Sequence, residues 1–92
     1  MATVTVHVPS ELRKYCGGVA DLGVAAATVR EALASLERTR PALYPNLCDE
    51  TGKVRRHLNV FVNDAHVRDL GGFDTPLAAG DVVTILTAVS GG

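Results

Sequence analysis

Hydrophobic and polar residues alternate over residues 2–8 (ATVTVHV), where valine occupies every second position. A two-residue period is typical of a strand with one buried face. Pro9 ends this strand because proline has no amide hydrogen to donate to a sheet. We interpret residues 11–18 as a connector with a glycine turn, and residues 19–26 as a second, weaker strand. The short link between them predicts an opening hairpin.

The period changes to that of a helix after residue 28. Thr28 and Glu31 have the spacing of a capping box, which satisfies two amides at a helix N-terminus. The apolar residues that follow lie on one helical face. They are Val29, Ala32, Leu33 and Leu36. Pro41 ends the helix.

The second half of the chain predicts three further strands. Residues 42–53 mix apolar and turn-forming residues, which indicates a short turn or half-helix and then a loop. Asn63-Asp64 has the turn chemistry that starts a hairpin, and residues 71–81 are expected to form a loop. The strands cover residues 55–64, 66–70 and 81–89.

This order, two strands, a helix and three strands, predicts an α+β fold. A mixed sheet of four to five strands with one main helix on one face is the simplest way to bury both apolar surfaces. We expect the last strand to be central in that sheet. Alternation then gives the inward residues of three strands. They are Val4, Val6, Val8, Leu58, Val60, Val62, Val83 and Ile85.

The chain has 92 residues, of which 47% are hydrophobic, and a formal net charge of −1. This length predicts a single domain with one core and little room for a deep catalytic cavity. The near-neutral charge does not favour nucleic acid or a membrane surface as a partner. No apolar run approaches the length of a membrane span, and the first residues lack the pattern of a signal peptide. A cytoplasmic location is therefore predicted.

The residues that could bind a metal are scattered. Cys16 and Cys48 have no partner at ligand spacing, and free cysteine is commonly a small buried hydrophobe. For Cys16, which begins a Cys-Gly-Gly sequence, a reactive thiol is the alternative. His7, His57 and His66 lie on separate segments. No metal site and no bound cofactor are predicted.

The sequence stops on ILTAVSGG, residues 85–92. Glycine contributes nothing to packing, so an ordinary frayed terminus is one explanation. The other is that the tail presents its carboxylate to the active site of another protein. The five residues after Thr87 can span about 16–18 Å when extended, and glycine does not obstruct a narrow channel. We therefore expect a folded domain over residues 1–87 and a flexible tail over residues 88–92.

The stretch LAAGDVVTI and the terminal Ala-Val-Ser-Gly-Gly resemble the ubiquitin-like sulfur carriers of the MoaD/ThiS family. The resemblance covers nearly the whole chain and implies a ubiquitin-like β-grasp fold. Within the family, the length and the segment LCDETGKVRRHLNVFVND are most similar to the CysO type, whose members deliver sulfur for cysteine synthesis. Thr87 stands where such tails commonly carry proline. The most specific residues are Leu77, Gly80, Asp81 and Val83, together with the final Gly91-Gly92.

The resemblance implies that Gly92 is the reactive residue. A ubiquitin-activating-like adenylyltransferase would join its carboxylate to AMP from ATP, and sulfur would displace AMP to give a thiocarboxylate. Val89, Ser90 and Gly91 would thread the channel of that enzyme. The chain would then be a co-substrate of enzymes and not an enzyme itself, with ATP used by its partner. The other implied partners are an acceptor enzyme, either a cysteine synthase or the large subunit of molybdopterin synthase, and a metalloprotease.

A docking surface is predicted from the outward phase of the strands. Phe61, Leu86 and His7 fall on the open face of the sheet near the tail. A large exposed aromatic residue is a candidate contact, and cover by residues 42–53 is the alternative. The basic run that contains Arg55 and Arg56 is either a solvated face or a docking patch for an acidic partner.

Two other functions remain open from the sequence alone. One is a non-carrier role as a β-grasp interaction module, which would not need a chain that ends in glycine. The other is a ubiquitin-like modifier, which would form isopeptide bonds to lysines.

Overall fold

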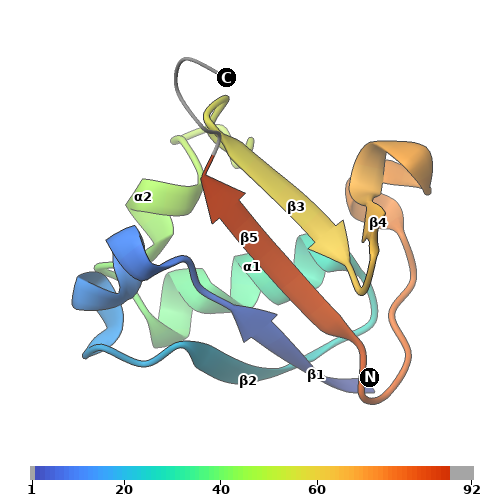
Figure 1. Ribbon diagram of the computed structural model, residues 1–92, viewed down its shortest axis with the longest axis horizontal. Helices are drawn as coiled ribbons and strands as arrows, with labels where there is room; N and C mark the ends of the chain where they lie inside the picture. Colours follow the sequence, from blue (N-terminus) through green and yellow to red (C-terminus); the bar gives the residue numbers. More distant parts are fainter. Residues whose placement is uncertain (1, 88–92) are drawn as a thin grey trace.

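The computed structural model describes residues 2–87, which form a five-stranded sheet with α1 on one face (Figure 1). The predicted order of strands and main helix is confirmed. The strands are β1 (Ala2–His7), β2 (Asp21–Ala26), β3 (Leu58–Val62), β4 (Ala65–His66) and β5 (Val82–Thr87). The helices are α1 (Val29–Thr39), α2 (Tyr44–Leu47) and the 3-10 turns η1 (Ser10–Cys16), η2 (Val67–Asp69) and η3 (Gly72–Asp74).

The sheet has the strand order β2-β1-β5-β3-β4. The pairing of β1 with β5 is parallel, and the other three pairings are antiparallel. The sheet is therefore mixed, and β5 is its central strand, as predicted (Figure 1).

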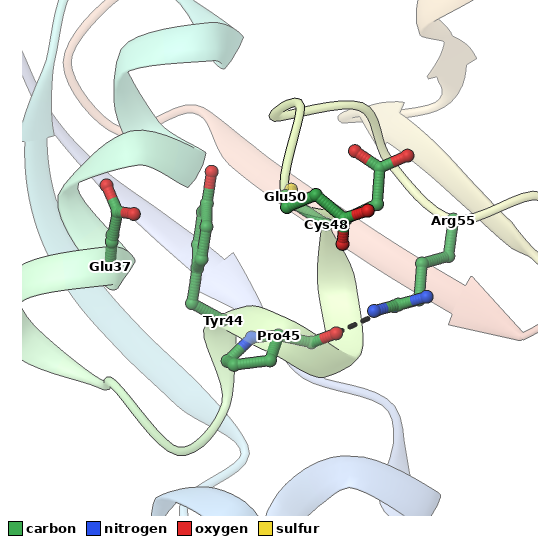
Figure 2. A pocket seen from close by; sticks show the side chains of 7 residues that line it. Glu37, Tyr44, Pro45, Cys48, Glu50 and Arg55 are labelled. Carbon is green, nitrogen blue, oxygen red and sulfur yellow. Dashed lines mark hydrogen bonds between the residues drawn. The ribbon is translucent and has the colours of Figure 1, made fainter.

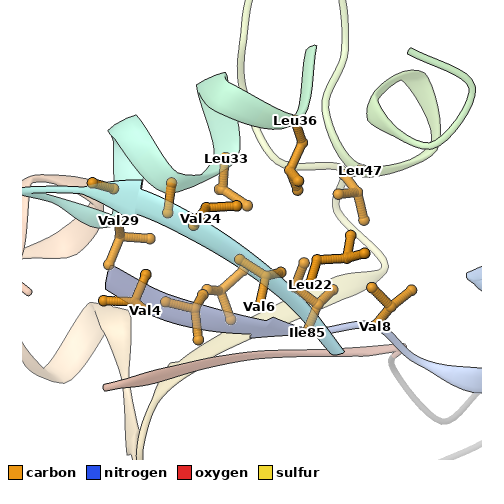
Figure 3. Packing of buried hydrophobic residues seen from close by; sticks show 14 of the residues in the cluster. Val4, Val6, Val8, Leu22, Val24, Val29, Leu33, Leu36, Leu47 and Ile85 are labelled. Atoms are coloured by element: carbon orange, nitrogen blue, oxygen red, sulfur yellow. The ribbon is translucent and has the colours of Figure 1, made fainter. Parts of the chain in front are cut away.

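The core lies between the sheet and α1. All eight inward residues predicted from alternation are buried, and so is the apolar face of α1 (Figure 3). Segments that the pattern left as connectors also contribute buried side chains. These are Leu12 and Cys16 of η1, Leu43, Leu47 and Cys48 around α2, and Leu77 before β5.

The N-terminus of α1 carries the predicted cap in a slightly different form. The Glu31 amide donates to Thr28 Oγ1 at 3.2 Å, as in a capping box. The Glu31 carboxylate accepts from the amide of Ala27 at 3.0 Å, one residue earlier than that motif requires. The helix ends at Thr39, shortly before Pro41.

Two predicted segments were wrong in type or extent. The connector over residues 11–18 is mostly the 3-10 helix η1, because Leu12 and Cys16 both turn into the core. The return strand over residues 66–70 is reduced to Ala65–His66. The chain then turns into η2, which buries Val67 in the core. The strands β1, β2 and β3 keep their positions but are shorter than predicted. The strand β5 begins at Val82, and the last two residues predicted for it lie outside the described residues.

The Gly-Asp motif forms the turn that leads into β5. Gly80 has a φ of 88°, a conformation that glycine adopts without strain. Asp81 accepts hydrogen bonds from the amide of Ala78 at 2.8 Å and from the side-chain amide of Asn63 at 3.2 Å. These two bonds, the first above all, lower the pKa of the Asp81 carboxyl. The motif thus fixes the entry of β5 between its two neighbours.

Candidate functional site

The described end of β5 lies beside the start of β3. Because β3 runs antiparallel to β5, its first residue, Leu58, pairs with Thr87. We call this the exit end of the sheet (Figure 1). The strand β1 does not reach it, because His7 pairs with Thr84.

The open face carries Phe61, Leu86 and His7 together. His7 and Phe61 flank Thr84 of the central strand, one from each side. Leu86 lies two residues further along the same strand and is 43% exposed. The strand register confirms that the three residues share one face. The predicted position near the tail holds for Leu86, whereas His7 and Phe61 lie three residues before Thr87 in the register.

Phe61 is half-buried rather than fully exposed. Its ring packs edge-on against the ring of His66 in β4, with the centroids 5.0 Å apart and the planes at 70°. His66 Nε2 lies 3.2 Å from Asn59 Oδ1. This contact holds Phe61 in a defined orientation on the open face.

Polar side chains border this apolar group. His7 Nδ1 lies 2.6 Å from Asp21 Oδ1 on the neighbouring edge strand. A central apolar contact with a polar rim is the usual anatomy of a protein interface. Asp21 and His66 were not predicted as members of this surface, because only the strand register shows that they share it with Phe61.

The predicted basic residues also lie at the exit end. Arg55 and Arg56 are exposed and precede Leu58, which pairs with Thr87. The Nε of Arg55 donates to the carbonyl oxygen of Pro45 at 2.7 Å, so this side chain also ties the segment before β3 to α2 (Figure 2). Arg56 is therefore the residue whose charge can be removed with less effect on the fold.

A surface cavity of about 280 Å³ lies beside Arg55 (Figure 2). Burial raises the pKa of the Cys48 thiol, and burial followed by the proximity of Cys48 raises that of Tyr44. A thiol with a raised pKa is a weak nucleophile, because the thiolate is the reactive form. Cys16 is also buried, and its Sγ donates to the carbonyl oxygen of Val19 at 3.3 Å. The interpretation of both cysteines as buried hydrophobes is confirmed. The cavity is lined by Glu37, Tyr44, Pro45, Cys48, Asp49, Glu50 and Arg55.

Within residues 2–87, no group of three or more histidine, cysteine, aspartate or glutamate side chains is placed to hold a metal ion. None of the helices in this range has the length and apolar character needed to cross a membrane.

Comparison with known proteins decides the family. The family model described as the ThiS family matches residues 6–92. The chain belongs to the ThiS family. This result confirms the resemblance predicted from the Gly-Asp motif and the glycine end.

The relatives of this ThiS-family chain match it over nearly its full length. The sulfur carrier protein CysO of Mycobacterium tuberculosis is 40% identical over 97% of this chain and 98% of its own. CysO in the crystal structure of the Amycolatopsis orientalis BexX/CysO complex is 39% identical, with a TM-score of 0.85, over 97% of this chain and 99% of that chain. The small archaeal modifier protein 1 of Methanosarcina acetivorans is 32% identical, with a TM-score of 0.84, over 100% of this chain and 98% of that chain. The ubiquitin-like β-grasp fold is confirmed by these structures.

The residues expected to carry the chemistry of this ThiS-family chain are Val89, Ser90, Gly91 and Gly92, and they lie outside the described residues. The structure describes the chain as far as Thr87, whose Oγ1 donates to Glu11 Oε2 at 3.0 Å. Sequence reasoning missed Glu11, because residues 11–18 carried no pattern that brings them to the end of β5.

Proposed function

We propose that this chain is a sulfur carrier whose Gly92 carboxylate is converted to a thiocarboxylate that donates sulfur for cysteine biosynthesis. The observation that carries the proposal is the near full-length similarity to CysO, which is named a sulfur carrier protein. The size of the chain agrees with a carrier role. The cavity of about 280 Å³ contains one thiol, that of Cys48, and burial raises its pKa, which disfavours the reactive thiolate.

The proposed reaction has two steps, both on a partner enzyme. A carboxylate is a poor electrophile, so its oxygen first attacks the α-phosphate of ATP, which releases pyrophosphate and leaves an acyl adenylate. The sulfur of a sulfide ion then attacks the acyl carbon and forms the carbon–sulfur bond, and AMP leaves with the bonding electron pair of the broken carbon–oxygen bond. The thiocarboxylate is a nucleophile on a tether, so the carrier needs no general base of its own. Because the reaction consumes ATP, the proposal includes a cytoplasmic location.

Two surfaces are proposed to dock the partners, an adenylyltransferase and a cysteine synthase that accepts the sulfur. The apolar group of Phe61 and Leu86 on the open face would supply the buried contact. The exposed charges of Arg55 and Arg56 would steer an acidic partner surface toward the tail. The apolar group reaches the residue before Thr87, and Arg56 lies two residues before Leu58, the partner of Thr87. Docking through both surfaces would therefore direct residues 88–92 toward the active site of the partner.

The proposal is tested by measuring the mass of the intact protein. The chain is incubated with an adenylyltransferase that acts on a CysO relative, together with ATP and a sulfide donor. We expect the mass to rise by one oxygen-to-sulfur exchange, localised to Gly92 by fragmentation, and no rise when ATP is omitted. An unchanged mass with an enzyme that modifies CysO under the same conditions would rule out the carrier function.

Replacing Phe61 by alanine should weaken docking more than it weakens the fold. Phe61 is half-buried on the open face, outside the core between the sheet and α1. We expect the KM for the carrier in thiocarboxylate formation to rise about tenfold or more, which corresponds to the loss of a central interface residue. The kcat should change little, because the tail is intact.

The matched control for Phe61→Ala is Thr3→Ala, which lies on the same face at the opposite end of β1 and is exposed. Its KM should equal that of the wild type. A docking role for Phe61 is refuted if its variant has an unchanged KM, or if the rise in KM is explained by the fraction of unfolded protein.

A modifier role is the second candidate, and the similarity to the small archaeal modifier protein 1 favours it. The two functions share the adenylate but differ in what attacks it. Lysine attack would leave isopeptide-linked adducts on cellular proteins, whereas sulfur attack leaves a free carrier with a thiocarboxylate. Purification of a tagged chain under denaturing conditions distinguishes them.

A further inference from the structure

The central strand is held unequally along its two edges. On one side β3 pairs with β5 as far as Thr87. On the other side the pairing with β1 stops at Thr84, because β1 ends at His7 and the chain turns away at Pro9. The last three residues of β5 therefore have a strand neighbour on one side only.

A side-chain contact takes the place of the missing strand. Thr87 has the inward phase of Val83 and Ile85, but its hydroxyl donates to Glu11 Oε2 at 3.0 Å. Glu11 belongs to η1, the turn that follows β1 and occupies the position beside the end of β5. The contact joins residues that lie far apart in the sequence and closes the unpaired edge.

The side chain of Glu11 is exposed, but the turn that carries it is anchored on both sides. Leu12, the next residue, is buried in the core, and the Nε of Arg13 donates to the carbonyl oxygen of Val8 at 3.0 Å. Both contacts hold η1 against the sheet. The other carboxylate oxygen of Glu11 accepts from the Ser10 hydroxyl at 3.1 Å.

The ionisation of Glu11 suits this role. The hydrogen bond from Thr87, as the largest cause, lowers the pKa of the Glu11 carboxyl. An ionised carboxylate only accepts hydrogen bonds, so the Thr87 hydroxyl is fixed as the donor. The pair has one geometry rather than two interchangeable ones.

We propose that Glu11 and Thr87 are positioning residues, whose contact fixes the direction in which the chain leaves the sheet and so aligns the Gly92 carboxylate in the partner's active site. This inference rests on the proposed carrier function.

The test is the steady-state kinetics of thiocarboxylate formation, with the carrier as the varied substrate. Thr87→Val removes the hydroxyl and keeps the shape, and Thr87→Ser keeps the hydroxyl. We expect kcat to fall about threefold to tenfold in Thr87→Val, the range set by the net contribution of one hydrogen bond. The KM should stay near that of the wild type, because the docking face is untouched, and Thr87→Ser should restore kcat. The proposal is overturned if the kcat of Thr87→Val lies within twofold of the wild-type value. It is also overturned if the kcat of Thr87→Ser falls as far as that of Thr87→Val.

A second measurement does not depend on the reaction. In Glu11→Ala, we expect the backbone order parameter of the amide at position 87 to fall, with that at Ile85 unchanged. If it stays at the wild-type value, the contact does not hold the end of β5, and the positioning role is overturned even where the carrier function stands. If the wild type forms no thiocarboxylate, the carrier function fails instead, and the order parameter still decides whether the contact restrains the strand.

Discussion

Deleting Gly92, or adding one residue after it, is expected to abolish thiocarboxylate formation. In the proposed reaction, the carboxyl carbon of the last residue is the atom that adenylation activates and sulfur attacks, so its distance from the docked domain would have to match the depth of the partner's active site. One residue changes the reach of an extended chain by about 3.3–3.6 Å. Reacting atoms must lie within about 3–3.5 Å of each other, so such a change removes them from reach. Intact mass after incubation with the adenylyltransferase, ATP and sulfide is the measurement.

Gly92→Ala separates the effect of length from that of the side chain. A Cβ at this position would lie beside the carbon under attack, so we expect little or no sulfur incorporation. Gly23→Ala is the matched control, because a Cβ there meets nothing within 4 Å and the residue lies in β2, away from the tail. Full activity of an extended chain that has not been trimmed by a protease would contradict the assignment of Gly92.

Ile85→Ala should produce the largest loss of stability. Ile85 is only 1% exposed and lies in the central strand, where the core meets α1 (Figure 3). Truncating a buried isoleucine to alanine typically lowers the free energy of unfolding by about 2–5 kcal/mol through lost burial and the cavity that remains. A small domain has only about 5–15 kcal/mol in total. Urea unfolding monitored by circular dichroism gives the difference directly.

The control for Ile85→Ala is its neighbour in sequence. Leu86 points to the opposite face of the same strand and is 43% exposed, so Leu86→Ala should change the free energy of unfolding by less than about 1 kcal/mol. Equal losses at both positions would show that the open face is covered in solution.

The strands and the helix could be predicted because their signals are local. Valine at every second position of β1 and the Thr28–Glu31 cap of α1 report the period and the start of an element directly in the sequence. The central position of β5 followed from the number of strands and the need to bury the helix. The period of a strand or helix is repeated over several residues, so one residue that departs from it does not obscure the pattern.

The 3-10 helix η1 and the two-residue strand β4 were missed for a different reason. Each is set by what it must cover: η1 turns Leu12 into the end of the core, and the chain after His66 turns to bury Val67. Such requirements depend on tertiary packing, which outweighs local propensity in short segments.

In the candidate site, too, some features could be predicted from local sequence patterns and others depend on tertiary packing. Phe61 and Leu86 follow from strand alternation, and the register confirms that they share a face. The side-chain contacts at the site do not follow from strand alternation. His66 against Phe61 and Glu11 against Thr87 each join segments whose relative position only the folded chain defines.

The central position of β5 also has a mechanical consequence. Under the proposed function, a partner that draws the tail into its active site would pull β5 along its own axis, and the hydrogen bonds to β1 and β3 lie across that direction. Both ladders would then share the load in shear, whereas an edge strand would have only one ladder to carry it. The domain would therefore resist tension on its tail while the partner acts on the end of the chain.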